Sequence, residues 1–253
     1  MTQQNRTLSV RRAAGIAAAA AIVTALSTVP ATALTAAPAA AHQQAAAPAY
    51  TPARRTLRYG MRGADVRRLQ DRLAALRYYP GRRDGHFGTD TLEAVWAFEE
   101  VQRIPVTGAI GSRTNWRLAH PSAPRPLVRN GAALRVEVDL GHQVLYVYHQ
   151  HRIVLISHVS SGGGYYYCSA GSCSYAVTPT GNFRTLWRVH GWHVAPLGLL
   201  YNPVFFDGGY AIHGDTAVPL QPVSHGCVRI PMDVAAIFPG LVPREGIPVY
   251  IRR

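Results

Sequence analysis

Hydrophobic positions near the middle of the chain recur with the spacing of amphipathic helices. The first set lies at intervals of three and four residues, as on one face of a helix: Val66, Leu69, Leu73 and Leu76. A second helix is expected over residues 92–98, with Asp90 and Glu93 forming a capping box at its start. The spacing therefore predicts helices rather than strands in this region.

Two segments of this helical region repeat each other at an offset of 23 residues, 84–91 and 107–114. Each has a glycine turn, an apolar residue, a second glycine and a threonine that enters a helix. The second segment leads into a short third helix at 112–119, with Trp116 and Leu118 available for packing. Together these features predict a small three-helix module over residues 57–119.

The pattern changes to a period of two in the C-terminal half. Apolar and charged residues alternate strictly over 134–140, which predicts a strand with one face exposed to water. Turns separate this strand from two further apolar runs, so an antiparallel meander is expected. The two apolar runs lie at 144–148 and 153–156. A short helix expected at 234–238 and a closing strand at 249–251 complete a mainly β domain, a sandwich or partial barrel.

The remaining segments are typical of a leader and of linkers. Residues 1–33 combine early arginines with an apolar stretch too short to span a membrane comfortably, as in a secretory signal peptide. An uncleaved leader that anchors the chain to a membrane is the alternative. Residues 34–56 are rich in Ala and Pro, and residues 120–130 contain three prolines, so both are expected to be linkers. The sequence thus predicts an exported multidomain protein, a small all-α module followed by a mainly β domain over 131–253.

The charge of the chain favours anionic partners. The net charge is +13, and about +10 would remain without the arginines of the leader. The arginines are scattered rather than clustered, which does not favour a nucleic-acid interface. An exported protein meets anionic wall polymers and the carboxylates of stem peptides, so these are the partners expected.

Three cysteines in an exported chain predict one disulfide and one free thiol. Cys168 and Cys173 flank a turn-prone run, so we expect them to form the disulfide and Cys227 to be free. A zinc site from the first two cysteines with His190 and His193 is the alternative. Its spacing lacks a Cys-x-x-Cys pair, and no metal site is expected.

The free cysteine lies in a polar string, Ser224-His225-Gly226-Cys227-Val228-Arg229. A cysteine is a nucleophile only as its thiolate, so it needs a base, and His213 precedes it with Gly214. A buried cysteine that only packs is the alternative, but these neighbours are poor core material. The string therefore predicts a catalytic thiol. The amides of Gly226 and Cys227 are the candidate oxyanion donors, and Arg229 the candidate site for a carboxylate.

With His213-Gly214, this string resembles the signature of the L,D-transpeptidases, which cross-link peptidoglycan, and Thr178-Pro179-Thr180-Gly181-Asn182-Phe183 is similar to another motif of that family. The resemblance covers about half of the chain, from about residue 130 to its end. It implies that Cys227 is the nucleophile and His213 its base. It also implies that Ser224, His225 and Gly226 build the oxyanion and substrate site and that Arg229 supports substrate binding. The loop from His213 to Cys227 is shorter than in the commonest form of the motif and contains Pro219 and Pro222, so it is expected to be stiff.

The helical region resembles the three-helix peptidoglycan-binding module of wall enzymes. The similarity rests on a few short motifs and on an aromatic residue of the second helix: Leu69-Gln70, Asp84-Gly85, Phe87-Gly88, Thr91, Ala94-Val95 and Phe98. In that family glutamine usually follows the residue that corresponds to Phe98, whereas this chain has Glu99. A module that only spaces the catalytic domain from the wall is the alternative.

The family resemblance implies a reaction without metal or cofactor. The Cys227 thiolate would attack the third residue of a donor tetrapeptide stem, release D-alanine, and leave a thioester that an acceptor stem resolves to a 3→3 cross-link. β-Lactams of the carbapenem class would acylate the same thiol. The group that orients His213 is left open among Asp207, Asp215 and the Gly214 carbonyl. An L,D-carboxypeptidase, in which water resolves the thioester, and a non-catalytic wall-binding protein are the alternatives.

Overall fold

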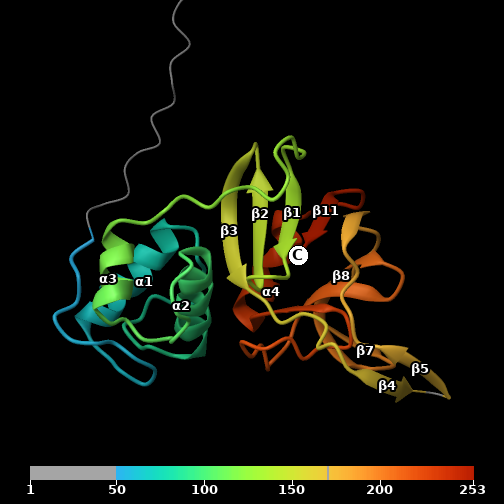
Figure 1. Cartoon of the computed structure of the whole chain (residues 1–253), viewed down its shortest axis with the longest axis horizontal. Coiled ribbons are helices and arrows are strands. Elements are labelled where there is room, and N and C mark those ends of the chain that lie inside the picture. The colour runs from blue at the N-terminus through green and yellow to red at the C-terminus, as the bar shows by residue number, and fades with distance from the viewer. Residues whose placement is uncertain (1–49, 170) are drawn as a thin grey trace, which may run out of the picture. The chain divides into compact units, whose positions relative to one another are not determined.

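A computed structural model describes residues 50–169 and 171–253, and the expectations for residues 1–49 lie outside this range. Three helices come first (Figure 1): α1 Ala64–Ala75, α2 Thr89–Val101 and α3 Ser112–Ala119. A mainly β region with one helix follows: β1 Arg135–Asp139, β2 Val144–His149, β3 Arg152–His158, β4 Tyr166–Ser169, β5 Ser172–Tyr175, β6 Gly181–Arg184, β7 Trp192–Ala195, β8 Gly198–Asp207, β9 Tyr210–Gly214, β10 Val228–Ile230, α4 Met232–Leu241 and β11 Pro248–Arg252. The predicted order, a three-helix module and then a mainly β domain, is confirmed.

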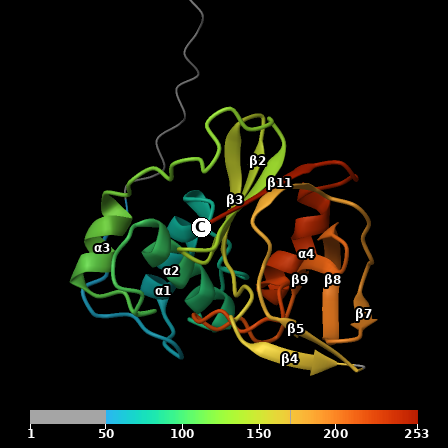
Figure 2. The same ribbon diagram turned by 45° about the vertical axis from the view of Figure 1, so that its right-hand side comes forward.

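The strands form two main sheets that share one core. One sheet has the order β3-β2-β1-β11-β6 and includes the predicted antiparallel meander, and the other has the order β10-β9-β8-β7. Apolar residues of both sheets meet those of α4 in this core, and α4 packs against β8 and β9 (Figure 2). The fully buried Phe238 of α4 lies at this contact and closes the core.

The helical module is built on two equivalent polar clusters, one for each repeat. Gln70 accepts a hydrogen bond from the Gly85 amide (2.9 Å) and donates one to Thr91 Oγ1 (3.0 Å). Glu99 accepts bonds from the equivalent amide of the second repeat, 23 residues further on, and from the equivalent threonine hydroxyl, Gly108 N at 2.8 Å and Thr114 Oγ1 at 2.9 Å. A glutamate suits the second cluster because its carboxylate accepts every bond made there. Glu99 is therefore a structural residue of the module.

The module packs against the outer face of β2 and β3. On β2, Leu145 and Val147 point into the core between the sheets, whereas Val144, Tyr146 and Tyr148 join Phe98 and other helix residues in a second core. Both faces of this strand are thus apolar and covered. The alternate residues of β2 that face the helices therefore hold the module against the sheet.

The exposed face that the alternation predicted for 134–140 is not found. Arg135 and Glu137 of β1 are buried, and their side chains pair with each other at 2.7 Å. The Leu127 amide donates to the Glu137 carboxylate at 2.7 Å, and the Arg135 guanidinium lies over the ring of Tyr148. The linker and the neighbouring strand cover this face, so its charges are neutralised within the fold.

The capping box predicted for the second helix is also wrong. The N-cap of α2 is Gly88, and no side chain caps this helix. Asp90 instead lies beside Asp233, and burial together with that carboxylate raises the pKa of Asp90 to about 6.

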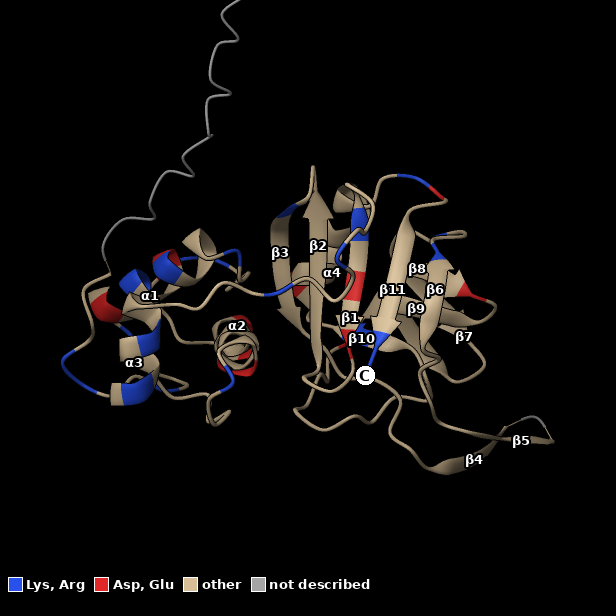
Figure 3. Cartoon of the chain, turned by 45° about the horizontal axis from the view of Figure 1, so that its top comes forward, with Lys and Arg blue, Asp and Glu red and all other residues tan. Residues whose placement is uncertain are grey.

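All charged residues of α2 are acidic, whereas those of α3 are arginines (Figure 3). Among the described residues, no helix is long and apolar enough to cross a lipid bilayer.

Candidate active site

Two parallel strands position the candidate nucleophile and base. β10 pairs with β9 so that Arg229 lies opposite His213 and Val228 opposite Ile212. Val228 and Ile230 are fully buried in the core, so the alternate residues Cys227 and Arg229 face the other way. His213 is on that same face of β9, two residues beyond the position opposite Cys227. Tight strand pairing therefore places the thiol and the imidazole as diagonal neighbours.

Both side chains line a pocket of about 310 Å³. Of the seven residues predicted for catalysis and binding, five line it: His213, Ser224, His225, Cys227 and Arg229. Gly214 and Gly226 are not among its lining residues. Residues distant in the sequence are thus gathered around one cysteine.

The backbone fixes the tautomer of His213. Its Nδ1 lies 2.9 Å from the carbonyl oxygen of Gly214, and a carbonyl oxygen only accepts hydrogen bonds. Nδ1 therefore carries a proton, and Nε2 is left with a lone pair. Burial lowers the pKa of His213, so the ring is neutral at pH 7 and can act as a base. Of the three orienting groups considered, the Gly214 carbonyl is the one in contact.

The Cys227 thiol is half-buried in apolar surroundings. Its Sγ accepts a hydrogen bond from the Ala211 amide at 3.4 Å and packs beside Leu200 and Phe205. Burial raises the pKa of Cys227, while the Ala211 amide and the charge of Arg229 act in the opposite direction. A raised thiol pKa beside a lowered imidazole pKa favours a neutral pair over an ion pair in the free protein.

Arg229 is held by an acidic residue of the loop that follows β9. Its Nε lies 3.1 Å from Asp215 Oδ2, and both side chains are about one-fifth exposed. Asp215 also accepts a hydrogen bond from the Ala217 amide at 2.9 Å. The guanidinium therefore faces the pocket with a fixed orientation, available to a substrate carboxylate.

Hydrogen bonds hold the turn before the cysteine. Ser224 Oγ donates to the Cys227 carbonyl and accepts from the Gly226 amide at 3.0 Å. Gly226 has φ +136°, and a Cβ there would meet Tyr210, so glycine is required. Thr178 donates to the Gly226 carbonyl at 2.8 Å. Of the two amides predicted as oxyanion donors, that of Gly226 is thus already bonded to Ser224.

A disulfide-closed hairpin lies next to His225. β4 and β5 pair with Cys168 opposite Cys173, and these residues form the predicted disulfide. Tyr167 of β4 lies against the His225 ring, with the ring centroids 4.6 Å apart. Figure 1 shows β4 and β5 projecting beyond the two main sheets, and Tyr167 of β4 lines the pocket.

Sequence reasoning missed the hairpin of β7 and β8, which forms one wall of the pocket. Its turn, residues 195–200, contributes six lining residues, and both Leu197 and Leu199 are exposed there. The available signal was Pro196-Leu197-Gly198 between two apolar runs, which indicates a hairpin turn. The wall is apolar, so it would accept the uncharged part of a substrate.

Comparisons with known proteins agree with this arrangement. A family model described as the L,D-transpeptidase catalytic domain matches residues 133–251, and one described as a putative peptidoglycan binding domain matches residues 62–118. A crystal structure of the L,D-transpeptidase from Xylanimonas cellulosilytica DSM 15894 is 34% identical with a TM-score of 0.74, and the alignment covers 80% of this chain and 100% of that one. The chain therefore belongs to the L,D-transpeptidase family, whose members are cysteine transpeptidases.

Two further matches are more distant or shorter. A crystal structure of an L,D-transpeptidase from Stackebrandtia nassauensis is 25% identical with a TM-score of 0.44, over 80% of this chain and 97% of that one. The carboxy-terminal processing protease CtpB of Bacillus subtilis (strain 168) is 40% identical over 58 residues, 23% of this chain. The chain spans only 12% of the length of that curated relative.

Proposed function

We propose that this enzyme forms 3→3 cross-links in peptidoglycan through a thioester on Cys227. The observation that carries the proposal is the placement of Cys227 and His213 as diagonal neighbours in one pocket, with an imidazole tautomer that leaves Nε2 free to take a proton. The module over residues 62–118 supports an enzyme that works on the wall.

In the proposed reaction, His213 Nε2 takes the thiol proton as Sγ attacks the carbonyl carbon of the third residue of a donor tetrapeptide stem. The Cys227 amide donates to the oxyanion, since the Gly226 amide is bonded to Ser224. The tetrahedral intermediate expels D-alanine as an amine that receives the proton from His213. The amine of an acceptor stem then attacks the thioester, which restores the thiol and completes the cross-link.

Arg229 is proposed to bind a carboxylate of the stem, and His225 with Tyr167 to form the opposite wall. The disulfide of the β4–β5 hairpin supports an oxidising compartment outside the cytoplasm. We propose that the protein is exported and acts at the cell wall.

The first test is the intact mass of the full chain after incubation with a carbapenem. One adduct is expected on the parent protein and none on Cys227→Ala. His213→Asn keeps a donor near the Gly214 carbonyl but removes the base, so its acylation rate is expected to fall by about 10²-fold or more. Acylation of Cys227→Ala would contradict the assignment of the nucleophile.

The second test identifies the acceptor. With disaccharide tetrapeptides as substrate, mass spectrometry is expected to show 3→3 dimers and released D-alanine. Tripeptides without dimers would show that water is the acceptor. If neither dimers nor tripeptides form, the result would favour a non-catalytic wall-binding protein.

A further inference from the structure

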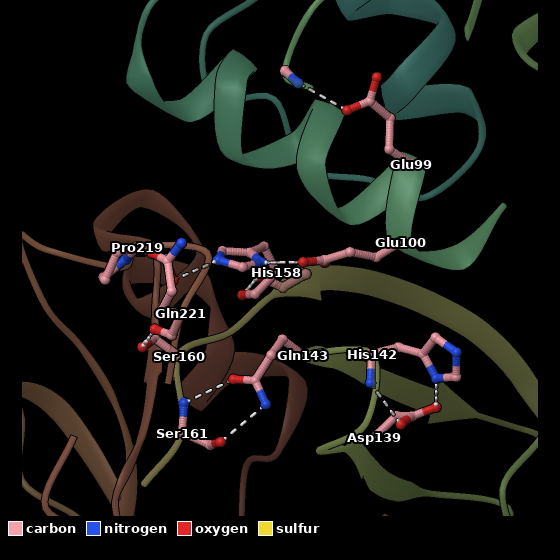
Figure 4. A network of polar contacts seen from close by, with 12 residues as sticks. Glu99, Glu100, Asp139, His142, Gln143, His158, Ser160, Ser161, Pro219 and Gln221 are labelled. Carbon is pink, nitrogen blue, oxygen red and sulfur yellow. Dashed lines mark hydrogen bonds and ion pairs between the residues drawn. The ribbon is translucent and has the colours of Figure 1, made fainter. Parts of the chain in front are cut away.

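A buried histidine outside the pocket joins the helical module to the active-site loop. His158 lies at the end of β3 and is 1% exposed. Its Nδ1 lies 2.9 and 3.1 Å from the two carboxylate oxygens of Glu100 on α2, and its Nε2 lies 3.2 Å from the carbonyl oxygen of Pro219 (Figure 4). Pro219 belongs to loop 215–224, which runs from the strand of His213 toward Cys227.

The proton balance of this bridge is defined by its partners. The Pro219 carbonyl only accepts, so Nε2 carries a hydrogen. One more proton lies between Nδ1 and the carboxyl group, either on the ring as an imidazolium or on Glu100 as a neutral acid. Both forms make the same two contacts, and removal of that proton would set a lone pair against a carboxylate.

Neighbouring charged groups are already engaged and offer no substitute. Glu99 of α2 accepts bonds from Thr107 and Gly108, and His142 of the β1–β2 turn bonds Asp139 at 2.9 Å. The rings of His158 and Trp96 of α2 pack in a T-shaped arrangement, with centroids 5.4 Å apart. Burial raises the pKa of Glu100 to about 7, against the charge of His158.

Ser160 and Ser161, shortly after His158, bind the same loop. Ser160 Oγ donates to the Gln221 carbonyl at 2.8 Å and accepts from the Val223 amide at 3.2 Å. The Ser224 amide donates to the Ser161 carbonyl at 2.9 Å. Figure 4 shows His158 between Glu100 and Pro219, with the contact of Ser160 with Gln221 nearby. The loop that these contacts hold continues to Ser224, whose hydroxyl bonds the backbone of Gly226 and Cys227.

We propose that His158 is a positioning residue that ties loop 215–224 to α2, so that the helical module sets the geometry of the pocket beside Cys227. The proposal rests on the proposed function only in taking Cys227 as the reacting group. A module that holds this loop is a part of the active site rather than a separate tether. A histidine that merely fills space between α2 and β3 would affect global stability without a specific effect on the loop.

Two substitutions separate the two contacts of the ring. His158→Asn keeps an N–H donor near the position of Nδ1, toward Glu100, and loses the contact with Pro219. His158→Gln keeps a donor near the position of Nε2, toward Pro219, and loses Glu100. Glu100→Ala removes the partner on the module, and His142→Asn is the matched control, since His142 does not contact the loop.

The experiment is hydrogen exchange of the full chain by mass spectrometry, with the alkylation rate of Cys227 as a second readout. His158→Asn is expected to speed exchange in 215–224 about tenfold and to change the alkylation rate at least threefold, with exchange in α1 and β11 unchanged. Glu100→Ala is expected to act in the same direction, and the double variant to add little, because one chain of contacts is broken. His158→Gln is expected to restore part of the loop protection.

Loop exchange in His158→Asn equal to that of the parent or of His142→Asn would overturn the proposal. So would a uniform increase across all segments together with a lower Tm, which indicates a purely structural role. Neither readout requires cross-linking activity, so this proposal and the proposed function fail separately: the first by unchanged loop exchange, the second by the absence of a carbapenem adduct.

Discussion

At the scale of single residues, the pocket favours the protonated form of Cys227, the proposed nucleophile. Burial raises the pKa of Cys227 and lowers that of His213, so the proton stays on sulfur in the free protein. A resting thiol is less exposed to oxidation than a resting thiolate. This suits an enzyme proposed to work in an oxidising compartment.

The alkylation rate of Cys227 is therefore expected to rise continuously from pH 6 to pH 10. Arg229 lowers the pKa of the thiol, so Arg229→Ala is expected to move this profile to higher pH, and Arg229→Lys to move it less. The measurement is the rate of iodoacetamide addition followed by intact mass. A plateau already present at pH 6 would show a preformed ion pair and contradict the neutral pair.

The sequence contained the chemistry of the site but only part of its geometry. Cys227, His213 and Arg229 were predicted together because a thiol, an imidazole and a cation lie near one another in the sequence, and all three line one pocket. The bond between the Gly226 amide and Ser224 Oγ was not predictable, because it depends on the conformation of a turn. The turn after Ala195 was missed as a pocket wall because only tertiary contact brings it to the cysteine.

At the scale of the elements, one side of α2 is apolar and another carries buried carboxyl groups. Its apolar positions form the module core, while several of its carboxyl groups are buried toward the β domain. Burial, with Asp90 and Asp233 nearby, raises the pKa of Glu93 to about 8 from an ordinary 4.5. The folded state thus binds this proton more tightly than the unfolded state, so Glu93 reduces stability progressively as pH rises through the interval between these two values.

Glu93→Gln is accordingly expected to leave Tm nearly unchanged at pH 4 and to raise it by several degrees at pH 8. The exposed Glu245→Gln is the matched control and should shift Tm little at either pH. Thermal unfolding followed by circular dichroism measures both. A stabilisation that is larger at pH 4 than at pH 8 would have the wrong sign for a buried acid.

Elements were predictable where a local pattern decided them. The helix over 64–75 follows from periodicity, because it buries one apolar face, and the helix over 112–119 follows from the repeated segment that leads into it. The strands of the meander follow from short apolar runs separated by turns, although both faces of β2 are covered. The capping box failed because Asp90 and Glu93 match that motif in sequence while tertiary contacts with the β domain hold them. The prediction of an exposed face on β1 was wrong for a related reason: the charged side chains of this face pair with each other beneath the segment around Leu127.

At the scale of the whole molecule, the module and the sheet share a core, and we expect residues 50–253 to unfold together. Ile156 of β3 is 2% exposed and lies in the same cluster as Phe98 of α2. Ile156→Ala is expected to cost about 2–4 kcal/mol and to destabilise both regions equally. Helix content by circular dichroism and protection of Cys227 from alkylation should be lost with the same midpoint. Separate midpoints would show two independent folding units.

Because the module packs on the sheet beside the one that carries Cys227, the distance from the peptidoglycan-binding domain to the Cys227 sulfur is expected to vary less than it would on a flexible tether. Under the proposed function, such an enzyme would join stems at a fixed distance from the glycan strand that its module binds. The spacing of its cross-links would then depend on the dimensions of the protein as well as on the supply of donor stems.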